Sequence, residues 1–224
     1  MKKLGGKIIE NNFMTIKSKV GLMLFLCFKL FIVVFTLISC SPKKLLPDKL
    51  TAYIQDEANG LKQTQAIGNF KYTITYRPID LIVWQEIGNK GKREDSVIAN
   101  LRKNYEQYNY FILNISAAGK DALYGASGSM EAFSQNLQNL SYHMTQYSYA
   151  VTEKKDTLTL KDFYFPRLYG MGGGTQVMLV YNRTKDPGEY TDIYIEDIGL
   201  GTGRQKFRFK KEDMESVPAL DYQI

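Results

Sequence analysis

The chain has 224 residues, and its 29 lysines and arginines outnumber its 23 aspartates and glutamates, which gives a formal net charge of +6. It contains a single histidine, His143, and two cysteines, Cys27 and Cys40. These counts exclude metal sites built from two or more imidazoles. They also exclude a disulfide framework and cysteine zinc sites from everything after residue 40.

The first 39 residues have the three parts of an export signal in the expected order. A lysine-rich segment is followed by the apolar runs 22–28 and 30–38, and Ser39 is the small residue at the cleavage position. A second methionine, Met14, opens a more compact basic segment. Translation from either Met1 or Met14 is therefore compatible with the pattern.

The segment Leu37-Ile38-Ser39-Cys40 resembles the lipobox of bacterial lipoprotein precursors, in which a lipidated cysteine becomes the new N-terminus. The resemblance covers the export segment alone. It implies that residues 1–39 are removed as a signal peptide and that Cys40 carries fatty acyl chains such as palmitate, with membrane lipid as the partner. An uncleaved transmembrane anchor over residues 20–38 is the alternative, although Lys29 near its centre would cost roughly 2.5 to 3.5 kcal/mol.

Six lysines and one acidic residue lie in residues 1–39, so the remaining 185 residues hold 23 basic and 22 acidic residues, a net charge of +1. A nucleic-acid partner is not expected, because such domains carry a clustered basic excess. We expect a tether over residues 40–60 and one globular domain over residues 61–224. No acidic residue follows Cys40 directly, which favours the periplasmic side of the outer membrane over surface display.

In the expected tether, Leu50, Tyr53 and Ile54 have the spacing of a short helix. The first strand is predicted over residues 70–77, where aromatic and aliphatic residues alternate with polar ones. Pro78 and Gly88 bracket a helix over residues 79–87, although residues 82–84 also suit a strand.

A second helix is predicted from Ser96 to about Gln107, with Asp95 as its N-cap and one apolar side. A strand follows over residues 108–115. The glycine-rich segment 117–129 is expected to be a loop. The members of the helix's apolar side are Val97, Ile98, Leu101 and Tyr105.

Ser129 is positioned to cap a third helix with a core-facing stripe at spacings of three and four residues. The stripe consists of Met130, Phe133, Leu137, Leu140 and Met144. Strand-like segments follow at 147–152, 157–165, 175–181, 190–198 and 205–210. Two or three short helices in the first half and an antiparallel sheet or sandwich in the second half predict an α+β domain.

The last strand of the predicted hairpin carries a stripe of cations at Arg204, Lys206, Arg208 and Lys210. An anion-binding surface is one interpretation. The other is a hairpin closed by residues 199–203, which pairs Glu196 with Lys206, Tyr194 with Arg208 and Asp192 with Lys210. The same register pairs Ile198 with Arg204 and, on the buried side, Ile195 with Phe207 and Ile193 with Phe209. Opposite charges across a ladder contribute roughly 0.2 to 1 kcal/mol per pair, so we favour the hairpin.

Catalytic, cofactor-binding and metal-ligating residues cannot be assigned from motifs. The glycines of 199–203 do not match a dinucleotide or phosphate loop, and 125–129 does not match a nucleophile elbow. His143 is expected to be a packed or surface residue. The glycine loop 170–174 is either a connector or a segment that closes over a ligand beside Tyr164, Arg167 and Tyr169.

Two functions fit these observations. The favoured one is a non-catalytic lipoprotein whose domain binds an envelope protein or glycan or plays a structural part. The alternative is an anchored hydrolase that acts on a glycan through two carboxylates brought together by the fold. All 16 tyrosines follow residue 40, and they suit half-exposed sheets as well as sugar contacts.

Overall fold

The computed structural model describes residues 44–88, 94–126, 128–166 and 173–223. Its helices are α2 (Pro47–Gln55), the 3₁₀ turn η1 (Glu57–Asn59), α3 (Ile79–Ile87), α4 (Asp95–Tyr105), α5 (Ala122–Ala126), α6 (Met130–Tyr142), α7 (Met144–Tyr147) and α8 (Lys211–Glu215). Its strands are β1 (Lys62–Ile67), β2 (Phe70–Tyr76), β3 (Tyr108–Ala117), β4 (Lys120–Asp121), β5 (Ser148–Thr152), β6 (Thr157–Tyr164), β7 (Thr175–Asn182), β8 (Tyr190–Ile195) and β9 (Gln205–Lys210).

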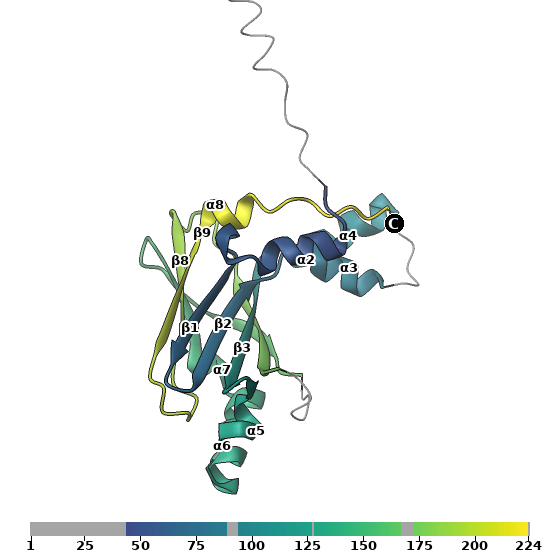
Figure 1. Ribbon diagram of the computed structural model, residues 1–224. Helices are drawn as coiled ribbons and strands as arrows, with labels where there is room; N and C mark the ends of the chain where they lie inside the picture. The colour runs from purple at the N-terminus through teal and green to yellow at the C-terminus, as the bar shows by residue number, and fades with distance from the viewer. Residues whose placement is uncertain (1–43, 89–93, 127, 167–172, 224) are drawn as a thin grey trace, which may run out of the picture. The chain divides into compact units, whose positions relative to one another are not determined.

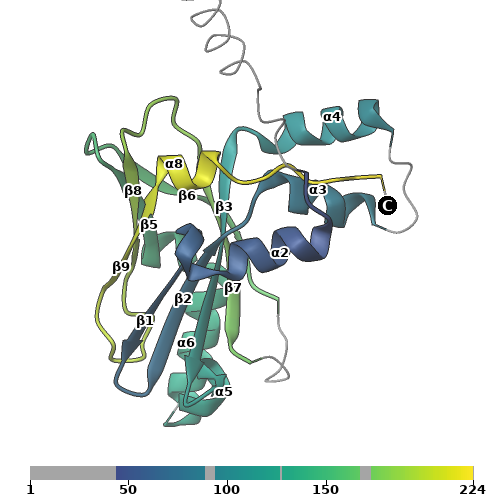
Figure 2. The ribbon, with the colours of Figure 1, turned by 45° about the horizontal axis from the view of Figure 1, so that its top comes forward.

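All nine strands belong to one antiparallel sheet with the order β1-β2-β3-β7-β6-β5-β8-β9, and β4 pairs with β3. The sheet curls nearly into a barrel, with the helices gathered at its two ends (Figures 1 and 2). The α+β class is therefore confirmed. A second packed sheet is not found among the described residues, and three of the strands lie in the first half of the chain, where only two were expected.

The core fills the inside of the curled sheet. In β2, β3 and β9 alternate residues point inward, as the pleat of a strand requires. Phe111 of β3 meets Phe209 of β9 with ring centroids 4.9 Å apart, although the two strands are not neighbours in the sheet. The Tyr181 hydroxyl, also buried, shares a hydrogen bond of 2.5 Å with the Ser148 hydroxyl.

Helix α3 has the bounds that its sequence predicts, and Gly88 follows it with a φ of 58°. Helix α4 buries Ile98, but Val97 on the expected core side is 37% exposed. Ser129 caps α6, since its hydroxyl accepts from the Ala132 N–H at 3.2 Å. The predicted core-facing stripe of α6 includes Met130, but this side chain is 73% exposed. The stripe therefore begins one turn later than predicted.

The compact unit starts at Lys44, earlier than the predicted tether allows. Helix α2 packs on the core through Leu50 and Ile54, both buried. The Leu45 N–H donates to the Ala219 carbonyl and the Leu45 carbonyl accepts from the Asp221 N–H, both at 2.8 Å. Residues 45–60 are thus part of the domain, and Cys40 lies outside the described residues.

The predicted register of the last hairpin is wrong by two residues. Asp192 faces Arg208 and Ile193 faces Phe207, and β8 ends at Ile195. The slip keeps the cations outward and the aromatic residues inward. The cause is Asp197, whose carboxylate accepts hydrogen bonds from four backbone N–H groups of the following loop. These bonds fix the loop from residue 197 onward, so the strand ladder ends before it.

Within the described residues, no helix has both the length and the apolarity needed to cross a bilayer. The apolar stretch 20–38 lies outside those residues.

Candidate functional site

A groove of about 990 Å³ lies on the outward face of β2, β3 and β7, and residues of α2 and α3 border it. Figure 2 shows these two helices beside the strands. Its size falls in the range of roughly 300 to 1,000 Å³ that is typical of small-ligand sites. The core lies on the other face of the same strands. The pleat that buries Ile74 and Leu113 therefore also determines which residues form the floor of the groove.

The floor consists of two rows that run across the strands. Thr73, Asn114 and Gln176 stand directly opposite one another on β2, β3 and β7 and form a polar row. Beside it, Ile112 stands opposite Met178 and the two form an apolar row. A floor with a polar row next to an apolar one suits a ligand that has hydroxyl groups on its edge and carbon on its face.

The apolar row continues to Thr75 on one side and to Tyr164 on the other. Tyr164 is 61% exposed and lines the groove together with Gly173. The flanks of the predicted glycine loop thus border the groove. Residues 167–172, with Arg167 and Tyr169, lie outside the described part of the chain.

Asn114 holds an unsatisfied acceptor at the centre of the floor. Its Oδ1 atom is buried and has no hydrogen-bond partner among the described residues. Leaving such an acceptor unpaired costs about 1 to 3 kcal/mol. Gly174 lies against the same amide, and a Cβ atom at position 174 would come within 2.3 Å of Asn114 Oδ1.

The rim of the groove is cationic. Lys62, Lys71 and Arg77 line it, and Glu86 is the one carboxylate among its described lining residues. The Arg77 guanidinium donates to the Gln85 side chain at 3.0 Å. Burial lowers the pKa of Arg77 from its ordinary value.

Glu86 is already engaged at the edge of the groove. Its carboxylate accepts a short hydrogen bond from the Tyr105 hydroxyl. This bond, followed by burial, raises the pKa of Tyr105. The described lining therefore does not contain the close carboxylate pair that a two-carboxylate hydrolase needs.

His143 and the cation stripe, which were also singled out from the sequence, lie outside the groove. His143 is a half-buried residue at the junction of α6 and α7. The predicted cation stripe is largely paired, because Arg204 contacts Glu196 at 2.7 Å and Asp192 contacts both Lys206 and Arg208. Most of the charge of the stripe is therefore neutralised within the hairpin itself.

Sequence reasoning missed Asn114 and its neighbours. The available signal was a polar residue in the middle of an apolar strand, in Phe111-Ile112-Leu113-Asn114-Ile115. Within the described residues, no cluster of three or more histidine, cysteine, aspartate or glutamate side chains is placed to hold a metal ion.

No family model and no curated protein matches this chain. A protein of unknown function from Burkholderia pseudomallei K96243 is similar in structure, with a TM-score of 0.39 and 11% identity over 80% of this chain and 96% of that one. A DUF4426 family protein from Pseudomonas aeruginosa PAO1 has a TM-score of 0.32 and 11% identity over 66% of this chain and 94% of that one. Both scores are low, so the site is interpreted from its own geometry.

Proposed function

We propose that this protein is a lipid-anchored component of the bacterial envelope whose domain binds a glycan in the groove over β2, β3 and β7 without cleaving it. The observation that carries the proposal is the buried Oδ1 atom of Asn114, which has no hydrogen-bond partner in the part of the chain that the structure describes. A ligand hydroxyl or amide N–H that donates to this atom would recover the free energy that an unpaired buried acceptor costs.

The rest of the groove supports the same ligand class. Thr73 and Gln176 flank Asn114 with further donors and acceptors, and Ile112 and Met178 offer the apolar surface that the carbon face of a sugar ring packs against. Lys71 on the rim adds a positive charge for acidic sugars. The anchor at Cys40 is the part of the proposal that comes from the lipobox resemblance.

Replacement of Asn114 by leucine tests the groove. Leucine has the branching of asparagine and removes the unpaired acceptor, which offsets the roughly 1 to 3 kcal/mol that its larger methyl groups cost in a packed site, so the free energy of unfolding should stay within about 1 kcal/mol of wild type. Binding should fall at least tenfold. Titration calorimetry of the full chain in detergent, against defined oligosaccharides of the neutral, N-acetylated and uronic-acid classes, measures both the affinity and the preferred class.

The control is Gln146→Leu on the exposed side of α7, which should leave binding unchanged. Failure of every oligosaccharide to bind, or undiminished binding by Asn114→Leu, would contradict the proposal. Release of reducing ends during incubation would instead support the hydrolase.

A further inference from the structure

The curled sheet does not close through its backbone. Its first strand, β1, and its last, β9, lie side by side, but no backbone hydrogen bond joins them among the described residues (Figure 1). Two glutamine side chains of β1 bridge the gap instead. We call this line between β1 and β9 the seam.

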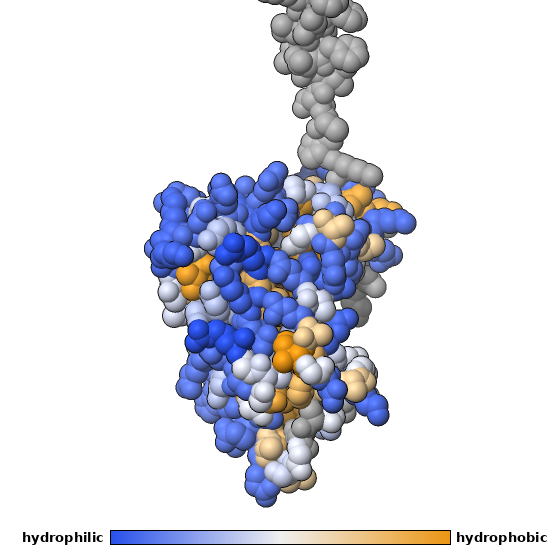
Figure 3. Space-filling view, turned by 60° about the vertical axis from the view of Figure 1, so that its left-hand side comes forward, coloured by the Kyte–Doolittle hydropathy of each residue, from blue (hydrophilic) through white to orange (hydrophobic). Residues whose placement is uncertain are grey.

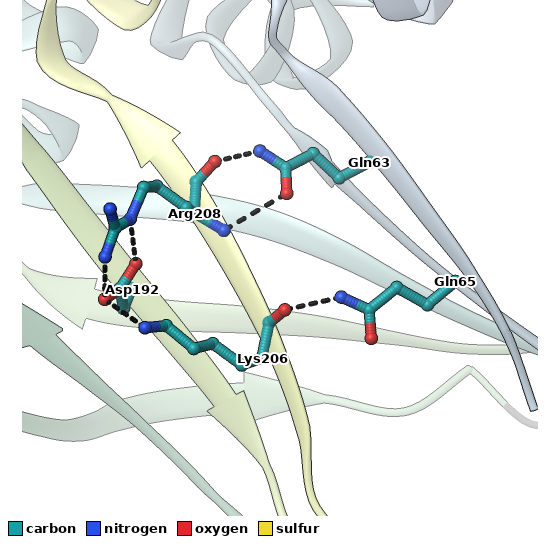
Figure 4. Close-up of polar contacts among 5 residues, drawn as sticks. All are labelled: Gln63, Gln65, Asp192, Lys206 and Arg208. Carbon is teal, nitrogen blue, oxygen red and sulfur yellow. Dashed lines mark hydrogen bonds and ion pairs between the residues drawn. The ribbon is translucent and has the colours of Figure 1, made fainter.

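At the seam, Gln63 pairs with both backbone groups of Arg208 (Figure 4). Its amide N–H donates a short bond to the Arg208 carbonyl, and its Oε1 accepts from the Arg208 N–H at 3.1 Å. Gln65 donates to the Lys206 carbonyl at 2.5 Å. A primary amide carries the same donor and acceptor as a peptide group. The two glutamines thus occupy the positions that the peptide groups of a neighbouring strand would take.

Both edges of the seam present backbone groups in the pattern of an open strand. The Tyr76 N–H donates to the Leu61 carbonyl, so the alternation of an antiparallel ladder turns the peptide groups of Thr64 toward the seam. The Lys211 N–H donates to Glu189, and by the same alternation Arg208 faces the seam from β9. A strand placed between β1 and β9 would therefore find partners on both sides.

Strand β1 is poorly held. Its sequence, Lys-Gln-Thr-Gln-Ala-Ile, lacks the apolar alternation that fixes a register, and none of its six residues is fully buried. Among the described strands, only β2 pairs with it through the backbone. An edge with few apolar contacts opens at lower free energy than the core strands do.

The two sides of the seam differ in character. Inward, Phe207 and Phe209 are fully buried next to the glutamines. Outward, Lys206 and Arg208 share the single carboxylate of Asp192, at 2.9 and 2.7 Å, so one positive charge is left over (Figure 4). The surface on this side of the molecule is largely hydrophilic (Figure 3).

We propose that the seam is a binding site for an extended segment of a partner protein that inserts between β1 and β9 as an added strand. Its backbone replaces the glutamine bridges and completes the barrel, a mode of recognition known as β-augmentation. The outward side of the segment should carry acidic residues, because Lys206 and Arg208 lie on that side. Its inward side should carry apolar residues, because Phe207 and Phe209 are buried there. The site is separate from the groove, and it does not depend on the glycan proposal.

A seven-residue peptide of alternating valine and glutamate, capped at both ends, is the probe. Incubated with the full chain in detergent, it should protect the backbone amide of Arg208 and that of Thr64 from hydrogen exchange. A valine–lysine peptide and a valine–glutamate peptide with a central proline should bind at least tenfold more weakly, since the first repels the cations and the second lacks a ladder donor.

Replacement of both glutamines by alanine removes the competing bridges. In Gln63→Ala/Gln65→Ala the Arg208 amide should exchange faster in the free protein, and the valine–glutamate peptide should bind at least threefold more tightly. Gln146→Ala is the matched control and should change neither value. As a second variant with the bridges intact, Lys206→Gln should weaken binding of the same peptide at least threefold.

Several results would overturn the proposal. The first is equal affinity of the protein for the three peptides. The second is binding of the valine–glutamate peptide without protection of the Arg208 and Thr64 amides. The third is an affinity for that peptide that stays unchanged in both the double glutamine variant and the Lys206 variant. A dimer with protected seam amides in the absence of peptide would also overturn it, because a second copy of the chain would then fill the seam.

Discussion

At the scale of single residues, the carboxylate of Asp197 fixes the loop formed by residues 199–203 through hydrogen bonds to its backbone. Its Oδ1 atom accepts from the N–H groups of Gly199, Leu200 and Gly201 at 2.9, 2.7 and 3.1 Å, and its Oδ2 atom accepts from Gly203 at 3.1 Å. Burial alone would raise the pKa of this carboxyl, but the four donors outweigh burial and lower the pKa below its ordinary value. The ionised form therefore stabilises the folded state.

Asp197→Asn should lower the free energy of unfolding at pH 7 by about 1 kcal/mol, because the amide cannot accept all four bonds. A carboxyl with a lowered folded pKa stabilises the protein above its unfolded pKa of about 3.9, and the effect is lost as the pH falls through the folded value. Urea denaturation between pH 7 and pH 2.5 should show the two proteins converging in acid. Asp162→Asn, at an exposed position, is the control, and a pH-independent difference would contradict the assignment.

At the scale of elements, Asp80 of α3 ties together segments that are distant in sequence. Its carboxylate accepts from the Arg102 guanidinium of α4 at 2.7 and 2.9 Å and from the Leu220 N–H at 3.1 Å. The Tyr222 hydroxyl donates to the Asp80 carbonyl at 3.1 Å. Leu45 pairs with the same C-terminal segment, so the two ends of the domain are held against one pair of helices.

Asp80→Ala should lower the free energy of unfolding by about 2 kcal/mol, since it leaves Arg102 and a backbone N–H without their acceptor. Hydrogen exchange should rise selectively at Leu220 and its neighbours. Arg102→Ala, combined with Asp80→Ala in a double-mutant cycle, should give a coupling energy above zero. Additive effects of the two changes, or unchanged exchange at Leu220, would show that the attachment of the C-terminal segment does not depend on this ion pair.

Elements with a strong local pattern were predictable from sequence. Helix α3 and strand β9 have the predicted bounds, because Pro78 and Gly88 mark the helix and period-two alternation marks the strand. Strand β1 was missed, since it is polar on both faces and is defined by its pairing with β2. The groove was missed for a similar reason. Asn114 and Gln176 become neighbours only through strand pairing.

At the scale of the whole molecule, the length of the chain limits how far the domain can lie from the proposed anchor at Cys40. Five peptide units separate Cys40 from Leu45, the first of the described residues that pairs with the rest of the fold. Such a segment spans at most about 18 Å. In a lipidated protein, the end that carries α2, α3 and the C-terminal segment is therefore held near the bilayer.

Intact mass spectrometry of the detergent-extracted protein should find a chain that starts at Cys40 and carries an acyl-glyceryl adduct. Cys40→Ala should accumulate as a precursor that retains residues 1–39, since a lipobox without its cysteine is not processed. Cys27→Ala is the matched control and should be processed normally. A wild-type protein that keeps residues 1–39 would instead identify the transmembrane anchor.

The pairing of Leu45 with Leu220 also decides where a reporter should be attached. In a lipidated protein, a fluorescent protein fused to the C-terminus would crowd the end of the domain held near the bilayer and would strain the contacts of Asp80 with Leu220 and Tyr222. The turn between β1 and β2, with exposed Gly68 and Asn69, is at the opposite end of the sheet (Figure 1). An epitope spliced into that turn would be accessible to antibody and would leave both chain ends untouched.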